Sequence, residues 1–129
     1  MRILAIDHGT ARCGCAISDP SGTLARPLPV IEPTDPRRVA ELVGEHDVEL
    51  VVVGLPVGLG GEEGAQAELA RGFRDEVDAL VEMPVESYDE RFTTALAQTS
   101  AREGAAAAED SLAAAHLLES YLESRRGGS

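Results

Sequence analysis

The sequence contains no lysine, no asparagine and no tryptophan, and its two tyrosines and two phenylalanines make up only 3% of 129 residues. Aromatic side chains on which unpaired bases could stack are therefore scarce. No apolar run approaches the roughly 20 residues that a membrane span requires, so we expect no membrane partner. Met1–Asp7 is too short, and its charge comes too early, for a signal peptide. These absences favour a soluble, intracellular protein.

Positive charge is also scarce. Eleven arginines stand against 23 acidic residues, which gives a formal net charge of −12. Such a balance argues against a protein that holds nucleic acid by bulk charge. The charge balance does not exclude a protein that binds nucleic acid locally, through bound metal ions.

The sequence has only two cysteines, Cys13 and Cys15. Their spacing places them on one face of a strand, and no second Cys/His pair stands at metal-ligand spacing. A disulfide framework and a zinc site are therefore both unsupported. We expect the two cysteines to act as small core hydrophobes.

The first thirty residues predict an antiparallel meander of three strands. Arg2–Asp7 is apolar without a break, as in a strand that is covered on both faces. Cys13–Ser18 forms the second strand and Leu24–Ile31 the third. Pro27 and Pro29 confine the third strand to an edge of the sheet.

The remainder alternates between helices and strands. We expect a helix that begins at Asp35-Pro36, a strand Leu50–Gly54, a helix Ala65–Val81 with Leu69, Phe73, Val77 and Leu80 on its buried face, a strand Pro84–Tyr88, and helices Thr93–Arg102 and Ser111–Ser124. This order predicts an α/β fold, a five-stranded mixed sheet in the order 3-2-1-4-5 with helices on both faces. We expect one domain over residues 1–126, followed by a tail, 127–129.

Acidic residues stand where ligands of such a sheet bind, beyond the carboxyl ends of its parallel strands. Asp7 ends the first strand, Asp89 and Glu90 end the last, and Asp110 precedes the final helix. Converging carboxylates repel one another unless a divalent ion compensates. Hard oxygen donors suit Mg²⁺ or Mn²⁺, and two such ions ~4 Å apart can activate a water and stabilise the leaving oxygen of a phosphodiester.

Each of these residues also has a structural interpretation. Asp7 could bond the amides of the turn that follows it, and Asp110 could cap the final helix. Neighbours on a strand face opposite sides, so only one of Asp89 and Glu90 can join the site, and we favour Glu90. His8 could shuttle protons to the site or simply belong to the turn.

Four segments resemble the YqgF/RuvX family, and they occur in the family's order: Met1–Asp19, Val51–Pro56, Asp89–Thr94 and Asp110–Glu123. Ala25–Pro29 is similar to the family's third strand. The resemblance implies an RNase H-like fold and a cytoplasmic, Mg²⁺- or Mn²⁺-dependent nuclease. Its implied role is ribosome biogenesis, through maturation of the 5′ end of 16S rRNA. The older assignment of the family is resolution of Holliday junctions.

The resemblance also implies roles for particular residues. The catalytic and metal-binding carboxylates are Asp7, Glu90 and Asp110. The candidate substrate-binding residues stand beside two of them in the sequence: Gly9, Thr10, Arg12, Arg91 and Thr94.

The chain departs from the family pattern at three places. Ala11 replaces a basic residue, Val57–Gly61 replaces a polar loop, and the alanine-rich Gly104–Glu109 replaces a segment rich in lysine and arginine. Each lost phosphate contact weakens binding to nucleic acid. We therefore expect weak or partner-assisted nuclease activity.

Four hypotheses for function follow. The first is an endonuclease that acts on precursor rRNA, alone or in a ribosomal particle, as a monomer or homodimer. The second is a resolvase of branched DNA, which needs two sites related by a two-fold axis. The third is a non-catalytic module that binds RNA or ribosomes, prompted by the charge of −12. The fourth takes Asp7–Thr10 as the phosphate motif of the sugar-kinase and actin superfamily, whose proteins close two such domains on a nucleotide.

Overall fold

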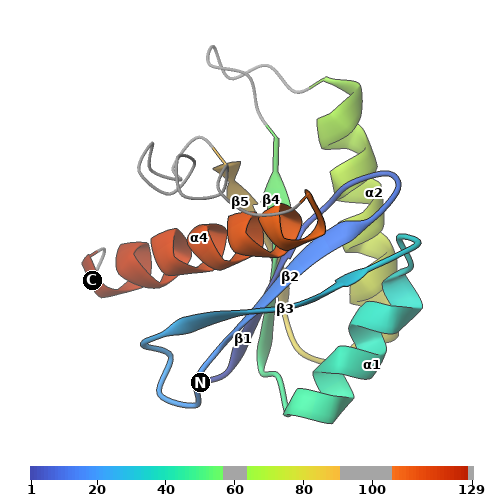
Figure 1. Ribbon diagram of the computed structural model, residues 1–129. Helices are drawn as coiled ribbons and strands as arrows, with labels where there is room; N and C mark the ends of the chain where they lie inside the picture. The colour runs from blue at the N-terminus through green and yellow to red at the C-terminus, as the bar shows by residue number, and fades with distance from the viewer. Residues whose placement is uncertain (57–63, 91–105, 128–129) are drawn as a thin grey trace.

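The computed structural model describes residues 1–56, 64–90 and 106–127, and side chains for 1–56, 64–90 and 111–125 (Figure 1). The elements are β1 (Ile3–Asp7), β2 (Cys13–Ser18), β3 (Ala25–Ile31), α1 (Pro36–His46), β4 (Leu50–Leu55), α2 (Ala65–Leu80), β5 (Val85–Asp89) and α4 (Ala106–Gly127).

The strands form one five-stranded sheet in the order β3-β2-β1-β4-β5, which confirms the predicted order. The central strand β1 pairs antiparallel with β2 and parallel with β4, and β4 pairs parallel with β5. Because β1, β4 and β5 run in the same direction, their carboxyl ends lie at the same end of the sheet.

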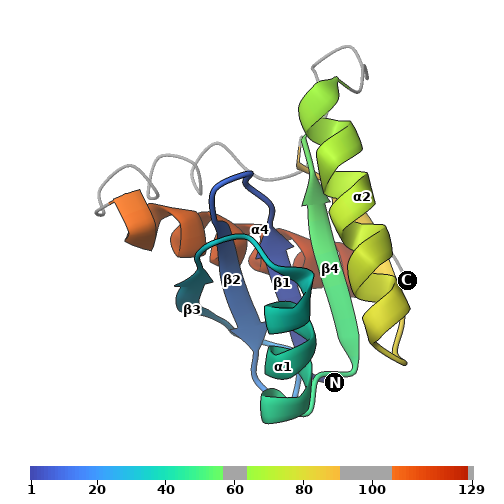
Figure 2. The same cartoon turned by 90° about the vertical axis from the view of Figure 1, so that its right-hand side faces the viewer.

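Helices cover both faces of the sheet, as predicted. Successive side chains of β1 point to opposite faces. Leu4 and Ile6 pack in the cluster that includes residues of α1 and α2, whereas Ile3 and Ala5 pack in the cluster that includes residues of α4. Figures 1 and 2 show α4 on one side of the sheet and α1 with α2 on the other. The complete burial of the central strands explains why their sequences are apolar without a break.

Helix α1 begins where the sequence predicts it. The side chain of Asp35 accepts a hydrogen bond from the backbone N–H of Arg37 at 2.9 Å, and Pro36 is the first helical residue. This is the geometry of an N-cap followed by proline. Val39, Leu42 and Val43 form the buried side of the helix.

The buried face of α2 differs from the prediction. Leu69 and Leu80 are each 48% exposed, and the buried residues are Ala67, Ala70, Phe73 and Val77. Only Phe73 and Val77 were predicted correctly. Two small alanine side chains lie on the inner side, and the two leucines lie beside the buried stripe rather than on it.

Helix α4 begins earlier than predicted, at Ala106 rather than Ser111. Alanine has the highest intrinsic helix propensity, so the alanine-rich stretch before Asp110 continues the helix toward its amino terminus. The predicted helix Thr93–Arg102 lies outside the described residues.

Both cysteines are free and buried, which confirms their placement in the core. Burial raises the pKa of the Cys15 thiol to about 12, and the neighbouring Cys13 adds to the shift. A thiol with so high a pKa is a poor nucleophile. In the described part of the chain, no helix is both long enough and apolar enough to cross a membrane.

Two leucine-to-alanine variants compare a buried position on α4 with a half-exposed position on α2. Leu118 on α4 is 0% exposed, so Leu118→Ala should lower the free energy of unfolding by about 2–5 kcal/mol. The matched variant Leu69→Ala truncates a half-exposed side chain and should cost less than about 1 kcal/mol. Urea denaturation measures both. Equal losses would place Leu69 on the buried face after all.

Candidate active site

The site begins at the ends of two neighbouring parallel strands. In the β1–β4 pairing Ile6 lies opposite Val53, so Asp7, the last residue of β1, lies beside Gly54, the next-to-last residue of β4. Alternation along β1 gives Asp7 the same face as Ile3 and Ala5, which is the face covered by α4. A partly buried carboxylate therefore lies at the end of a strand whose other residues are fully buried.

Glu90 reaches this face from β5. Tyr88 lies opposite Gly54 and contacts α4 through a 2.9 Å hydrogen bond between its hydroxyl and that of Ser120. Alternation along the strand directs Asp89 to the other face. A Cβ built on Gly54 would lie only 2.7 Å from Oε1 of Glu90, so the Glu90 carboxylate lies against the backbone of β4. The structure thus places Glu90, rather than Asp89, on the face that Asp7 shares.

The backbone of Asp110 lies inside α4, four residues after its first residue, Ala106. Asp110 is therefore not an N-cap, and the capping interpretation is wrong. Position 110 stands four residues before Ala114 and seven before Leu117, both of which pack against the sheet. This spacing puts position 110 on the sheet-facing stripe of the helix.

A buried hydrogen bond fixes the start of α4 on the sheet. The Ser111 hydroxyl donates to the backbone carbonyl of Leu28 in β3 at 2.5 Å, and Ser111 is only 5% exposed. Leu28 pairs with Cys15 in β2, and the neighbouring Gly14 pairs with Asp7. Ser111, which follows Asp110, is thus anchored to β3. One strand, β2, separates β3 from the strand that carries Asp7.

The structure places Asp7 beside Gly54 and the Glu90 carboxylate over Gly54, beneath the helix that carries Asp110. Carboxylate oxygens are suitable ligands for Mg²⁺ or Mn²⁺, so the residues that are present fit such an ion. Among the described side chains, no group of three or more His, Cys, Asp or Glu residues could hold a metal. The side chain of Asp110 lies outside that set.

The turn after β1 contains three of the candidate substrate-binding residues. A Cβ on Gly9 would collide with the carbonyl oxygen of Arg12, and the Gly9 carbonyl accepts a 2.6 Å hydrogen bond from the Thr34 hydroxyl. Glycine is therefore required here by the close approach of the backbone. Thr10 is exposed, and Arg12 forms an ion pair with Glu32 at 3.7 Å.

The other two candidate substrate-binding residues, Arg91 and Thr94, lie outside the described residues. The same is true of Val57–Gly61, where the sequence departs from the family pattern. Nothing in the described structure therefore bears on these positions.

His8 packs on the side of α2 rather than toward Glu90. The centroid of its ring lies 5.0 Å from that of Phe73, a residue of the α1 and α2 cluster. Burial lowers the pKa of His8, and the charge of Glu76 opposes the shift. These contacts favour the turn interpretation of His8 over a proton shuttle to the α4 face.

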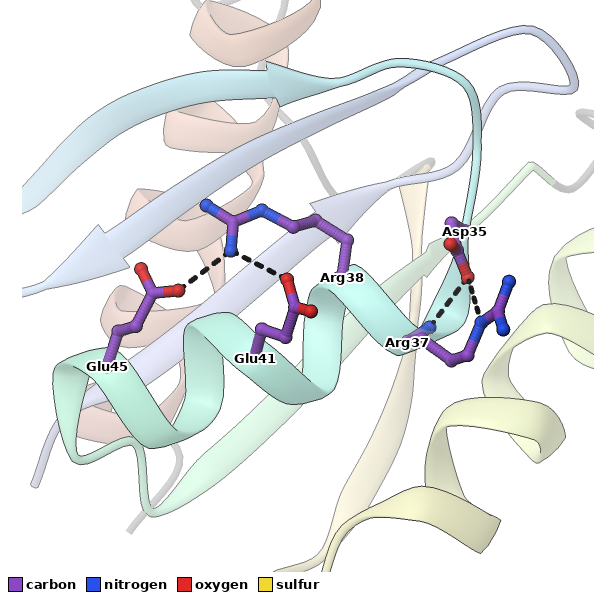
Figure 3. A network of polar contacts seen from close by, with 5 residues as sticks. All are labelled: Asp35, Arg37, Arg38, Glu41 and Glu45. Atoms are coloured by element: carbon purple, nitrogen blue, oxygen red, sulfur yellow. Dashed lines mark hydrogen bonds and ion pairs between the residues drawn. The ribbon is translucent and has the colours of Figure 1, made fainter.

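Two adjacent arginines at the start of α1 are paired within their own helix and its cap (Figure 3). Arg38 contacts Glu41 at 3.0 Å and Glu45 at 2.7 Å, and Arg37 contacts Asp35 at 3.3 Å. Hydrogen bonds to Glu45 and Glu41 raise the pKa of Arg38. Acidic partners thus offset the positive charge of this helix end.

An aromatic and polar connection between β5 and α4 was not predicted from the sequence. Tyr88 and Tyr121 pack edge to face with ring centroids 5.5 Å apart. The Tyr121 hydroxyl donates to Glu86 at 2.7 Å and accepts from Arg125 at 3.2 Å. These contacts hold the edge strand that leads into Glu90. The only related feature of the sequence is that it contains just two tyrosines. Both of them take part in this contact.

The fold belongs to a known class. T. thermophilus RuvC, solved in complex with a Holliday junction substrate, matches with a TM-score of 0.70 and 18% identity, over 99% of this chain and 97% of that one. At this identity the similarity shows the fold alone, which is the RNase H-like fold of the resolvase RuvC.

A family model described as RuvX, Holliday junction resolvase, matches residues 1–124, and the chain belongs to this family. A relative from Desulforudis audaxviator is 38% identical, over 99% of this chain and 98% of its own length. Another, from Mycobacteroides abscessus, is 42% identical, over 97% of this chain and 82% of its own length. Both are named "Putative pre-16S rRNA nuclease". The resemblance inferred from the four motifs is therefore confirmed.

The anchor of α4 can be tested through Ser111. Ser111→Ala leaves the buried Leu28 carbonyl without its partner, so the free energy of unfolding should fall by about 1–3 kcal/mol. Ser124→Ala is the matched control, because Ser124 is an exposed residue whose hydroxyl donates to the backbone carbonyl of Tyr121 within the same helix. Chemical denaturation compares the two variants. A Ser111→Ala protein as stable as the control would show that this bond does not anchor the helix.

Proposed function

We propose that the protein is a divalent-metal-dependent nuclease that processes the 5′ end of precursor 16S rRNA in the cytoplasm. The observation that carries the proposal is the position of two carboxylates beneath α4: Asp7 lies beside Gly54, and the Glu90 carboxylate lies over it. The printed names of the relatives support this choice of substrate. The RNase H-like fold supports the choice of reaction class, because T. thermophilus RuvC, which has a similar fold, was solved in complex with a Holliday junction substrate.

In this proposal Asp7, Glu90 and Asp110 hold one or two Mg²⁺ or Mn²⁺ ions. Bound metal would activate the attacking water and stabilise the leaving oxygen of the phosphodiester. The protein's contribution is rigidity. Asp7 ends a fully buried strand, Glu90 rests against the backbone of β4, and Asp110 directly precedes the anchored Ser111. The carboxylates of Asp7 and Glu90, held in this way, need little reorganisation when an ion binds.

Phosphate recognition is assigned to residues close to the site. Gly9, Thr10 and Arg12 follow Asp7 in the turn, and Arg91 and Thr94 follow Glu90 in the sequence. The pair of Arg12 and Glu32 is partly exposed, with a separation of 3.7 Å. Because exposed ion pairs contribute only about 0–1 kcal/mol, a substrate phosphate can take the place of Glu32.

Nuclease activity is tested by removing one carboxylate at a time. Asp7→Asn and Glu90→Gln should each lower cleavage of a precursor 16S rRNA 5′ segment by more than about 100-fold, since loss of outer-sphere partners alone costs 10–100-fold. Chelation of Mg²⁺ and Mn²⁺ should abolish cleavage. The rate of product formation on a labelled RNA is the measurement.

The matched control for this experiment is Asp89→Asn. Asp89 is adjacent to Glu90, but strand alternation directs it to the opposite face, so the variant should keep most of the activity. An Asp7→Asn protein that cuts as fast as the wild type contradicts the assignment. Metal binding without turnover on any RNA would favour the non-catalytic RNA- or ribosome-binding module.

Branched DNA is the second candidate substrate. The description of the family and the similarity to RuvC favour it. Resolution of a four-way junction requires two active sites related by a two-fold axis, and therefore a homodimer. Sedimentation with and without a four-way junction separates the two substrates. A protein that stays monomeric in both samples, yet cuts precursor RNA, excludes the resolvase.

A further inference from the structure

Gly54 occupies a position where the backbone does not require glycine. It lies in β4 between β1 and β5, opposite Tyr88, and its φ lies outside the positive range that side chains rarely adopt. An ordinary residue could therefore take the same backbone conformation. The reason for glycine must be the space above it.

That space is filled by Glu90. A Cβ on Gly54 would lie 2.7 Å from Oε1 and 3.3 Å from Cγ of Glu90, and 3.0 Å from Cδ2 of Leu117. Leu117 is only 2% exposed in the core beneath α4, so it has little room to move. Any side chain at position 54 would therefore displace the Glu90 carboxylate.

The order of the strands explains why Glu90 takes this path. β5 and β1 are separated by β4, so their ends are about 10 Å apart, twice the strand spacing of about 4.8 Å. A carboxylate that starts from the end of β5 must cross β4 to approach Asp7. The shortest path passes directly over position 54.

We propose that Gly54 is a positioning residue of the metal site: its missing side chain lets the Glu90 carboxylate lie across β4, within one strand spacing of Asp7. This inference rests on the proposed role of Glu90 as a metal ligand. Two features are needed together: the long side chain of glutamate at position 90 and the missing side chain at position 54. With only one of them, the carboxylate would stay on the side of β4 that is far from Asp7.

Mn²⁺ titration calorimetry on the intact protein, without substrate, tests the inference. Gly54→Ala should weaken Mn²⁺ binding by about 10–100-fold, as expected when a group that orients a ligand is lost. Glu90→Gln should weaken it as well. The double variant should bind no more weakly than Glu90→Gln alone, because the two residues act through one carboxylate. Gly44→Ala is the control, since Gly44 has open space around its Cβ position, and it should bind Mn²⁺ as the wild type does.

Thermal unfolding supplies a readout that does not depend on metal. Gly54→Ala should lower Tm through the clash, and adding Glu90→Ala should recover part of that loss because the displaced side chain is gone. If Gly54→Ala is too unstable to titrate, this recovery in the double variant decides the question. Losses of Tm that simply add would overturn the inference.

The two proposals fail in different ways. Unchanged Mn²⁺ affinity in Glu90→Gln overturns the proposed metal site, and with it the role of Gly54 there. Weakened affinity in Glu90→Gln together with wild-type affinity in Gly54→Ala overturns only the positioning role.

Discussion

The parallel register of β1 and β4 is the constraint on which the rest of the site depends. Because Ile6 lies opposite Val53, Asp7 at the end of β1 lies beside Gly54, the next-to-last residue of β4. The backbone of Gly54, which carries no side chain, is the surface against which the Glu90 carboxylate lies. A shift of one residue in β1 would exchange the two faces of that strand. Asp7 would then point toward α1 and α2, away from the helix that carries Asp110. Burial of both faces makes such a shift costly, so the core fixes the site.

The fold was predictable from the sequence because its signals are local and strong. The uninterrupted apolar runs of β1 and β4 indicate strands that are buried on both faces. Pro27 and Pro29 indicate an edge strand, and the Asp35-Pro36 pair indicates the first helical residue. Together with right-handed crossovers these signals lead to one strand order, which is the order observed.

Other features depend on packing that a single sequence does not reveal. Leu69 lies outside the buried face of α2 because two alanines, Ala67 and Ala70, take the inner positions. A prediction from periodicity gives large apolar residues more weight, and it therefore places the leucines on the buried face. The contact between Gly54 and Glu90 joins two strands about 35 residues apart, and no local pattern reports such a contact. In the sequence, strand alternation shows only that one of Asp89 and Glu90 can join the site. The pairing of β4 with β5 and the contact of Glu90 with Gly54 identify Glu90 as that residue.

The charge of the protein constrains how it can hold a polyanion. A chain with a net charge of −12 repels nucleic acid at long range, and several of the described arginines are paired with acidic side chains, such as Arg38 with Glu41 and Glu45. Attraction must therefore arise within a few ångströms of the site, where screening by salt is least effective. Divalent ions held by carboxylates reverse the sign of the local field. Acidic residues weaken long-range attraction of nucleic acid to the protein. The same type of residue is required to bind the divalent ions through which the protein can contact phosphate groups.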